Sequence, residues 1–296
     1  MLVCLSRVVG QFNSERRDDL IPASLALSAS LSLQEDVKQG KDAVATGGYE
    51  CPGIPEIKDP YQKRQWQLEH MAGAFRIFAR KGFTEGTSGH ISVRNTVDLS
   101  TFWINPISDP CSALTDDRLG VHFGLLKASD MIIGDNKTAV NAAGFAIHSA
   151  IHKARPDINA ACHTHSKYGK AWSSFGKPLD IISQDTCNFW GIQAVYNDFG
   201  GVVLTEEESR RVVDALGPKG KVLILQNHGI LTAGGTVDEA AYLYTLMERS
   251  CEVQLLVEAA GLEKKFIRDE SAEYTAKVNA DPYEIWKSKG ELKKGI

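Results

Sequence analysis

Apolar residues recur at helical spacing in several stretches of the chain, and each stretch has a recognisable boundary. Asp59-Pro60 combines a helix N-cap with proline at the first helical position, and Gly82 ends that helix. A second helix is predicted over 142–154. A third begins at the capping box Thr236-Val237-Asp238-Glu239 and continues to about Leu256. The chain is therefore rich in amphipathic helices with well-defined starts.

Short segments with the composition or alternation of β-strands separate these helices. Further helices are predicted over 166–174 and after an N-cap at Thr205. The predicted strands are Ile91–Arg94, its hairpin partner Thr101–Asn105, Asp130–Ile133, Ile158–His163, a strand end at Val202, and Lys221–Gln226. Because strands and helices interleave and an early hairpin is present, we predict an α/β domain with a mixed, largely antiparallel sheet covered by helices.

Residues 1–55 lack a sustained period and are predicted to form a flexible N-terminal arm, with the domain over 56–290. The net charge of −4, from 33 basic and 37 acidic residues, argues against nucleic-acid binding. Six scattered cysteines without a CxxC pair are typical of reduced thiols. No apolar run is long enough for a membrane span and no signal peptide is evident, so we expect a cytoplasmic protein without membrane contact.

The most informative chemistry lies in three histidines. His163 and His165 flank Thr164 at the end of an apolar run, so strand alternation places both rings on one face. His228 follows a second apolar run and precedes a turn glycine, from which it could complete a tripod. Three imidazoles with an open position are typical of catalytic zinc and suit other divalent ions, although His-x-His also occurs in hydrogen-bonded cores.

Two further histidines, His148 and His152, share a helix face four residues apart. That spacing is compatible with metal binding, but no acidic residue stands between them in the pattern that zinc proteases use. We therefore expect them to be surface histidines or histidines that support the site from behind.

Several segments, in order, resemble the class II aldolase/adducin family across about residues 60–260. The resemblance implies a single three-layer α/β/α domain, a homo-oligomer that is commonly a tetramer, and a small-molecule substrate. The segments are Gly89–Arg94, Ile147–Asp157, His163–Ser166, Phe199–Gly201, Gln226–Thr232 and Asp238–Ala241.

By motif match, the family's metal-ligand positions fall on His163, His165 and His228. The implied cofactor is a divalent metal, Zn²⁺ in the first place, with Fe(II) or Mn as alternatives. The resemblance also places the substrate-binding region, which contacts phosphate in the aldolases, on Gly86, Thr87, Ser88, Gly89, His90 and Ser92. A loop rich in glycine and hydroxyls offers N–H groups to an anion, and it is equally typical of a tight turn before a strand.

The chain departs from the aldolase pattern at the position of the acid/base glutamate, which holds Gly144 here. Glycine cannot transfer a proton, and losing a general base typically costs about 10²–10⁴ in rate. The candidates to replace it are Tyr168, Asp185, Tyr196 and Asp198, and the sequence does not choose among them. His90 stands where the aldolases have a phosphate-loop asparagine, and both changes are more similar to the adducin-type branch.

A second departure is an insertion over 107–118, which we interpret as a surface loop or an intron translated in error, with a substrate-specificity loop as the alternative. The resulting functional prediction is a metal-dependent, lyase-like enzyme acting on a small substrate with a carbonyl or hydroxy-carbonyl group. Two alternatives stay open: an Fe(II)-dependent oxygenase of secondary metabolism on the same fold, and a non-catalytic, adducin-like interaction domain.

Overall fold

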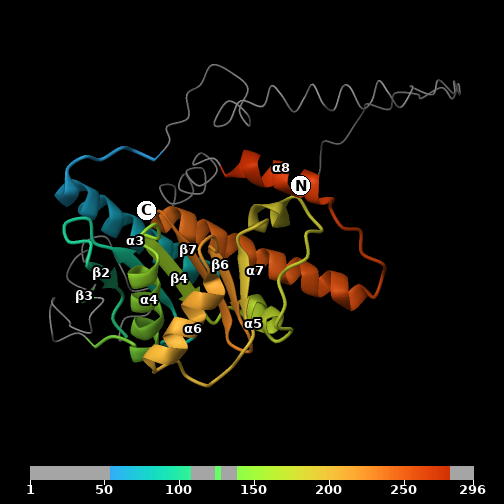
Figure 1. Ribbon diagram of the computed structural model, residues 1–296, viewed down its shortest axis with the longest axis horizontal. Helices are drawn as coiled ribbons and strands as arrows, with labels where there is room; N and C mark the ends of the chain where they lie inside the picture. The colour runs from blue at the N-terminus through green and yellow to red at the C-terminus, as the bar shows by residue number, and fades with distance from the viewer. Residues whose placement is uncertain (1–53, 108–123, 128–138, 281–296) are drawn as a thin grey trace, which may run out of the picture. The chain divides into compact units, whose positions relative to one another are not determined.

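The computed structural model describes residues 54–107, 124–127 and 139–280 (Figure 1). The predicted arm over 1–55 and the insertion over 107–118 lie almost wholly outside the described residues, and the predicted strand Asp130–Ile133 lies outside them entirely. The elements are α3 (Pro60–Arg80), β1 (His90–Arg94), β2 (Thr101–Ile104), β3 (Gly124–Lys127), α4 (Ala142–Ala154), β4 (Ala160–Thr164), α5 (Lys167–Ser173), the 3₁₀-helix η3 (Asp185–Phe189), β5 (Gln193–Tyr196), α6 (Glu206–Leu216), β6 (Val222–Leu225), β7 (Gly229–Gly234), α7 (Val237–Ala260) and α8 (Asp269–Asn279).

The strands form one seven-stranded sheet in the order β3-β2-β1-β4-β7-β6-β5. Only the β5–β6 pair is parallel among these neighbours, and the other pairs are antiparallel. Helices α3, α5 and α7 pack on one face of the sheet, while α4 and α6 pack on the other (Figure 1). The predicted α/β/α layering around a mixed, largely antiparallel sheet is therefore confirmed.

The helix starts follow the capping signals in the sequence. The carboxylate of Asp59 accepts a hydrogen bond from the Gln62 N–H at 2.8 Å, and Pro60 opens α3. Thr236 Oγ1 accepts from the Glu239 N–H at 3.1 Å, while the Glu239 carboxylate accepts from the Gly235 N–H at 2.7 Å. This exchange satisfies the Glu239 N–H in the first turn of α7 and the Gly235 N–H just before the N-cap. Among the described residues, no helix is both long and apolar enough to cross a membrane.

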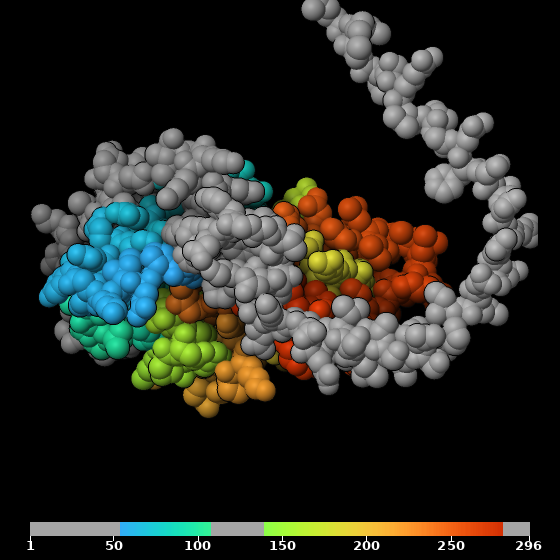
Figure 2. Space-filling view, turned by 90° about the horizontal axis from the view of Figure 1, so that it is seen from above, coloured from blue at the N-terminus to red at the C-terminus, as the bar shows by residue number. Residues whose placement is uncertain are grey.

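The core is divided between the two faces of the sheet by strand alternation. In β4, Ala160 and Cys162 join the core beneath α3, α5 and α7. The side chain of His163 therefore belongs to the opposite face, which α4 and α6 cover. In Figure 2 the light green surface of α4 adjoins the orange surface of α6, as their packing requires. The α4/α6 face is thus the one that carries the histidine chemistry.

Three strands were not predicted, and β3 (Gly124–Lys127) is one of them. β5 (Gln193–Tyr196) and β7 (Gly229–Gly234) are strands in the structure although the sequence pattern did not mark them. The predicted strand end at Val202 is wrong, because that residue lies in an irregular segment before α6. β5 is a half-buried edge strand and β7 contains two glycines, so both carry a weak alternation signal.

Candidate metal centre

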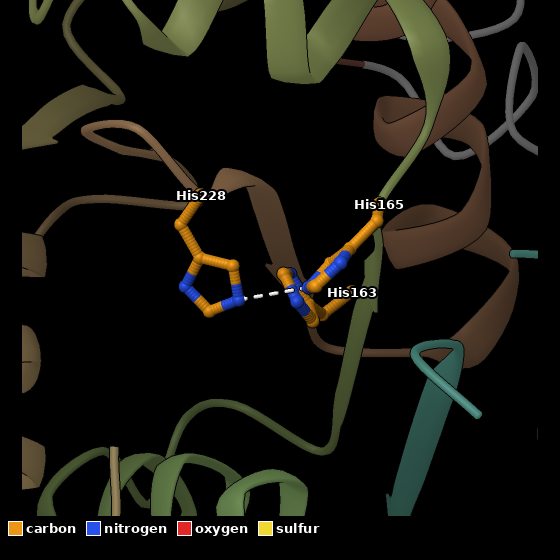
Figure 3. Close-up of side chains that lie close together, drawn as sticks. All are labelled: His163, His165 and His228. Carbon is orange, nitrogen blue, oxygen red and sulfur yellow. Dashed lines mark hydrogen bonds between the residues drawn. The ribbon is translucent and has the colours of Figure 1, made fainter. Parts of the chain in front are cut away.

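The three histidines come from two neighbouring parts of the sheet. His163 lies in β4, and His165 follows directly after the strand ends at Thr164. His228 lies in the turn between β6 and β7. Because β7 pairs with β4 in the register Thr164↔Ile230, this turn lies beside the end of β4. The three side chains consequently point toward one another (Figure 3).

The turn that carries His228 depends on an unusual backbone conformation. Asn227 has a φ of 56°, in the left-handed region that asparagine tolerates better than most residues. The His228 N–H closes the turn by donating to the Leu225 carbonyl at 3.0 Å. A Cβ atom at Gly229 would lie 3.2 Å from the Thr164 carbonyl oxygen, so glycine permits the close approach to β4.

One ring nitrogen from each of His163, His165 and His228 lies within 4.8 Å of the other two. His228 Nε2 lies 2.9 Å from His165 Nε2 (Figure 3). His163 Nδ1 donates to the Ile230 carbonyl at 2.9 Å, which leaves its Nε2 lone pair free to bind an ion. This arrangement matches the donor set of a three-histidine metal site.

The electrostatics of the three rings favour their neutral forms. Burial and the neighbouring histidines hold the pKa of His163 well below its usual value. Burial lowers the pKa of His228 to about 4, with a further contribution from His165. Burial also lowers the pKa of His165, and the positive charge of Lys170 lowers it further. Neutral imidazoles are the forms that bind metal ions, so the rings suit a divalent cation at neutral pH.

The segment that carries His165 is held by two side chains of α7. The buried Glu248 carboxylate accepts from Ser166 Oγ at 2.5 Å and from the N–H groups of Tyr168 and Gly169 at 2.8 and 2.7 Å. Tyr244 donates to the Thr164 carbonyl at 3.0 Å and shares hydrogen bonds with the hydroxyls on either side of His165. No sequence pattern marks either residue, because both lie on the buried side of a long helix without a recognisable motif.

The expectation of surface positions for His148 and His152 is wrong. Both are buried, with 1% and 2% of their surface exposed. Ser92 Oγ lies 2.6 Å from His148 Nδ1 and 2.8 Å from His152 Nε2. Burial lowers the pKa of His152 to about 3 and holds that of His148 well below its usual value. The two rings form a neutral cluster behind the site, so only the supporting role stays open.

The predicted substrate-binding residues are divided by the structure. Gly86 and Thr87 are exposed, whereas Gly89, His90 and Ser92 are buried. Asn105 Nδ2 donates to the Gly89 carbonyl at 2.9 Å and so fixes the end of the loop. The Ser92 hydroxyl is engaged by the two buried histidines and has no free surface for a substrate. Ser88 is partly exposed beside Thr87.

The predicted acid/base candidates also lie in different places. Tyr196 and Asp198 line a small pocket together with His228. Tyr168 lies on α5, where a hydrogen bond with Glu252 raises its pKa, and Asp185 is exposed on η3. The structure therefore places Tyr196 and Asp198 in one pocket with His228, and among the described residues no hydrogen bond or ring contact joins Tyr168 or Asp185 to the three histidines.

The structure is an α/β/α sandwich with a cluster of three histidines at the end of a central strand, and sequence comparison identifies the family. Residues 69–255 match the model of the Class II Aldolase and Adducin N-terminal domain. The chain therefore belongs to the class II aldolase and adducin family.

Three relatives illustrate the match. The Meiotically up-regulated gene 14 protein of Schizosaccharomyces pombe is 44% identical over 81% of this chain and 97% of its own length. Decarboxylase NovR of Streptomyces niveus is 39% identical over 70% of this chain and 76% of its own. The solved L-fuculose 1-phosphate aldolase of Glaciozyma antarctica PI12 is 36% identical, covers 81% of this chain and 96% of its own, and superposes with a TM-score of 0.68.

Proposed function

We propose that this chain is a metal-dependent, lyase-like enzyme in which His163, His165 and His228 hold a divalent ion. The observation that supports this most directly is the convergence of three ring nitrogens within 4.8 Å of one another. The His163 tautomer set by Ile230 and the lowered pKa values of all three rings add to the fit. Zn²⁺ is the first candidate ion, and Fe(II) and Mn²⁺ are the alternatives.

The proposed substrate is a small molecule with a carbonyl or hydroxy-carbonyl group. Two of the named relatives, a decarboxylase and an aldolase, carry names of enzymes that break carbon–carbon bonds. When bound, the ion supplies Lewis acidity for a carbonyl oxygen and for the negative charge that develops on it. The protein's own share would be to hold three neutral rings in place, from β4, from the residue just after it and from the β6–β7 turn.

Proton transfer needs a group other than Gly144, which has no side chain. Tyr196 and Asp198 are the better placed of the predicted candidates, because both line the pocket that includes His228.

Three apolar side chains are exposed in the segment that follows Asp198. Phe199, Val202 and Leu204 expose 53%, 70% and 63% of their surface. We expect a homo-oligomer, a tetramer by resemblance, to cover these apolar residues, and light scattering of the purified protein measures its mass.

Metal analysis tests the proposal. Protein purified without chelators should carry about one ion per chain by mass spectrometry, and His163→Ala should carry none. His70→Gln is the matched control, because His70 pairs with Asp238 at 2.7 Å on the opposite face of the sheet and should leave the metal content unchanged. Wild-type protein that takes up no Zn²⁺, Fe²⁺ or Mn²⁺ would contradict both enzyme functions and favour a non-catalytic, adducin-like domain.

Oxygen dependence separates the two enzyme functions. A panel of small α-hydroxy and α-keto acids and sugars is incubated with the metal-loaded protein, with and without O₂, and substrate loss is followed by mass spectrometry. If the protein is a lyase, the wild type consumes its substrate with and without O₂, and the His163→Ala variant consumes none. Loss that requires both iron and O₂ would instead support the oxygenase.

A further inference from the structure

Glu208 brings a carboxylate into the pocket that includes His228. It lies in the first turn of α6 and lines the pocket together with Tyr196 and Asp198. Only 6% of Glu208 is exposed, yet its oxygens are not closed to solvent as the Tyr196 hydroxyl is. Among the described residues, the carboxylate forms neither a hydrogen bond nor an ion pair. A buried charge without a partner is costly, so its presence in a pocket indicates that a ligand supplies the partner.

The carboxylate of Glu208 does not cap its own helix. In the capping box of α7, the Glu239 carboxylate accepts from the Gly235 N–H at 2.7 Å. In α6, Thr205 Oγ1 accepts from the Glu208 N–H at 3.2 Å, but no bond from the Glu208 carboxylate is returned among the described residues. Its Oε1 lies beside Gly200 instead, where a Cβ atom would come within 3.0 Å of it. The side chain is therefore left for the pocket, although the sequence around it is that of a capping box.

The positive group closest to Glu208 in the sequence is engaged elsewhere. Arg211 Nη1 pairs with Asp198 Oδ2 at 3.3 Å, so these two charges offset each other. His228 is neutral at pH 7, because burial lowers its pKa to about 4. The positive end of the α6 dipole stabilises a carboxylate only modestly. The side chains that line the pocket therefore carry a net negative charge, that of Glu208.

The Tyr196 hydroxyl also lacks a hydrogen-bond partner among the described residues. Only 8% of Tyr196 is exposed, and burial raises its pKa. Arg211 lowers the pKa of Tyr196, whereas Asp198 and Glu208 raise it further, which places the hydroxyl near these charges. An uncharged hydroxyl cannot balance the carboxylate of Glu208. This part of the pocket is therefore polar and negative, and two of its groups have no partner.

We propose that Glu208 is a substrate-binding residue whose carboxylate receives a positively charged group with N–H donors, such as a primary ammonium group, on a ligand beside His228. The inference rests on the function proposed above and adds a substrate class, a carbonyl or hydroxy-carbonyl compound that carries an amino group. An ammonium group offers three donors and the missing charge, and hydrogen bonds between charged groups are the stronger kind. The same carboxylate repels an anionic group such as a phosphate.

Hydroxamates that differ only in their end group measure this preference. Co²⁺-loaded protein is titrated with ω-amino hydroxamates of increasing chain length and with their methyl-ended counterparts, and the cobalt absorption bands are followed. The hydroxamate binds the ion through two oxygens and leaves the end group free to enter the pocket. At the best chain length, the wild type should bind the amino compound about 10-fold more tightly than its counterpart.

Two variants of the same helical turn assign that preference. Glu208→Gln keeps the shape of the side chain and removes its charge, so the two hydroxamates should then bind within about 2-fold of each other. Glu207→Gln is the matched control, because Glu207 is exposed in the same turn of α6 and should leave the preference unchanged.

The outcomes separate this inference from the function on which it rests. Equal binding of the two hydroxamates by the Co²⁺-loaded wild type, or a preference that survives Glu208→Gln, would overturn the role of Glu208 and leave the metal site intact. A wild type that binds no Co²⁺ would overturn the metal-binding function and this inference with it.

Thermal unfolding of the metal-free protein tests whether the carboxylate lacks a partner. Glu239→Gln should lower the melting temperature by about 2–4 °C, because its carboxylate binds the Gly235 N–H and pairs with Lys221. Glu208→Gln removes an unpaired buried charge and should instead raise the melting temperature by about 1–3 °C. A Glu208→Gln variant that is destabilised as much as Glu239→Gln would show that Glu208 caps α6 and would refute the proposal.

Discussion

The carboxylate of Glu248 should be a main determinant of stability, because it joins α7 to the segment after His165. It accepts from the Ser166 hydroxyl and from the N–H groups of Tyr168 and Gly169, at 2.5, 2.8 and 2.7 Å. The two N–H groups belong to the first turn of α5, where the helix itself provides no acceptor. Only 4% of Glu248 is exposed, so water cannot replace the lost bonds.

Two substitutions divide this contribution. In Glu248→Gln one amide oxygen still accepts, while the new NH₂ group faces an N–H donor, and one unsatisfied buried donor costs about 1–3 kcal/mol. Glu248→Ala leaves both N–H groups without an acceptor and adds a cavity, for a total of about 3–5 kcal/mol. The assay is urea unfolding followed by far-UV circular dichroism, with the unfolding free energy extrapolated to water.

Glu273→Gln is the control for the loss of a carboxylate. Glu273 pairs with Lys277 at 2.9 Å on the surface of α8, and its side chain is 55% exposed. Such a pair contributes less than about 0.5 kcal/mol. If Glu248→Gln is no less stable than Glu273→Gln, the carboxylate does not hold the α5 terminus, and the reasoning from its three hydrogen bonds fails.

Three further predictions concern the same face of the sheet. Burial lowers the pKa of His152 to about 3 and holds the pKa of His148 well below its usual value. Below pH 6.5 the unfolded chain therefore binds protons that the folded chain does not. Urea unfolding should therefore show stability falling from pH 6.5 toward 3, by up to about 1.4 kcal/mol per pH unit for each ring, and a flat profile would contradict this. Ser92→Ala removes the shared partner of both rings and should cost about 1–3 kcal/mol in the same assay, whereas an unchanged midpoint would show that the hydroxyl is dispensable. At Asn227, with its φ of 56°, Asn227→Ala should cost about 1 kcal/mol and Asn227→Gly should be tolerated, and the reverse order would refute the left-handed turn before His228.

Local signals in the sequence were sufficient for the helices. The Asp59 cap, the capping box at Thr236 and the predicted bounds 142–154 reappear in the structure. The grouping of His163, His165 and His228 could also be predicted, from the His-x-His spacing and the family motif, whereas the pairing of β7 with β4 is what brings His228 to the other two. Short strands with glycine or half-exposed residues, such as β5 and β7, carry too little pattern to be seen.

The surroundings of the site depend on pairing between distant segments, which no local pattern encodes. His90 meets His163 through the register of β1 on β4. His148 and His152 are buried where α4 packs on the sheet, and both contact Ser92 on β1, although a surface position was one of the two predicted alternatives. A Cβ atom at Gly144 would lie 2.7 Å from the His90 ring, and this proximity too is visible only once α4 is placed on the sheet.

The most direct test of the account is the coordination shell of the ion. X-ray absorption spectroscopy of the Zn²⁺-loaded protein should show nitrogen or oxygen neighbours at about 2.0–2.1 Å, with the outer-shell scattering of three imidazoles. His228→Ala should reduce that scattering by one ring. A sulfur neighbour at about 2.3 Å, or imidazole scattering that His228→Ala leaves unchanged, would contradict a metal centre built from His163, His165 and His228.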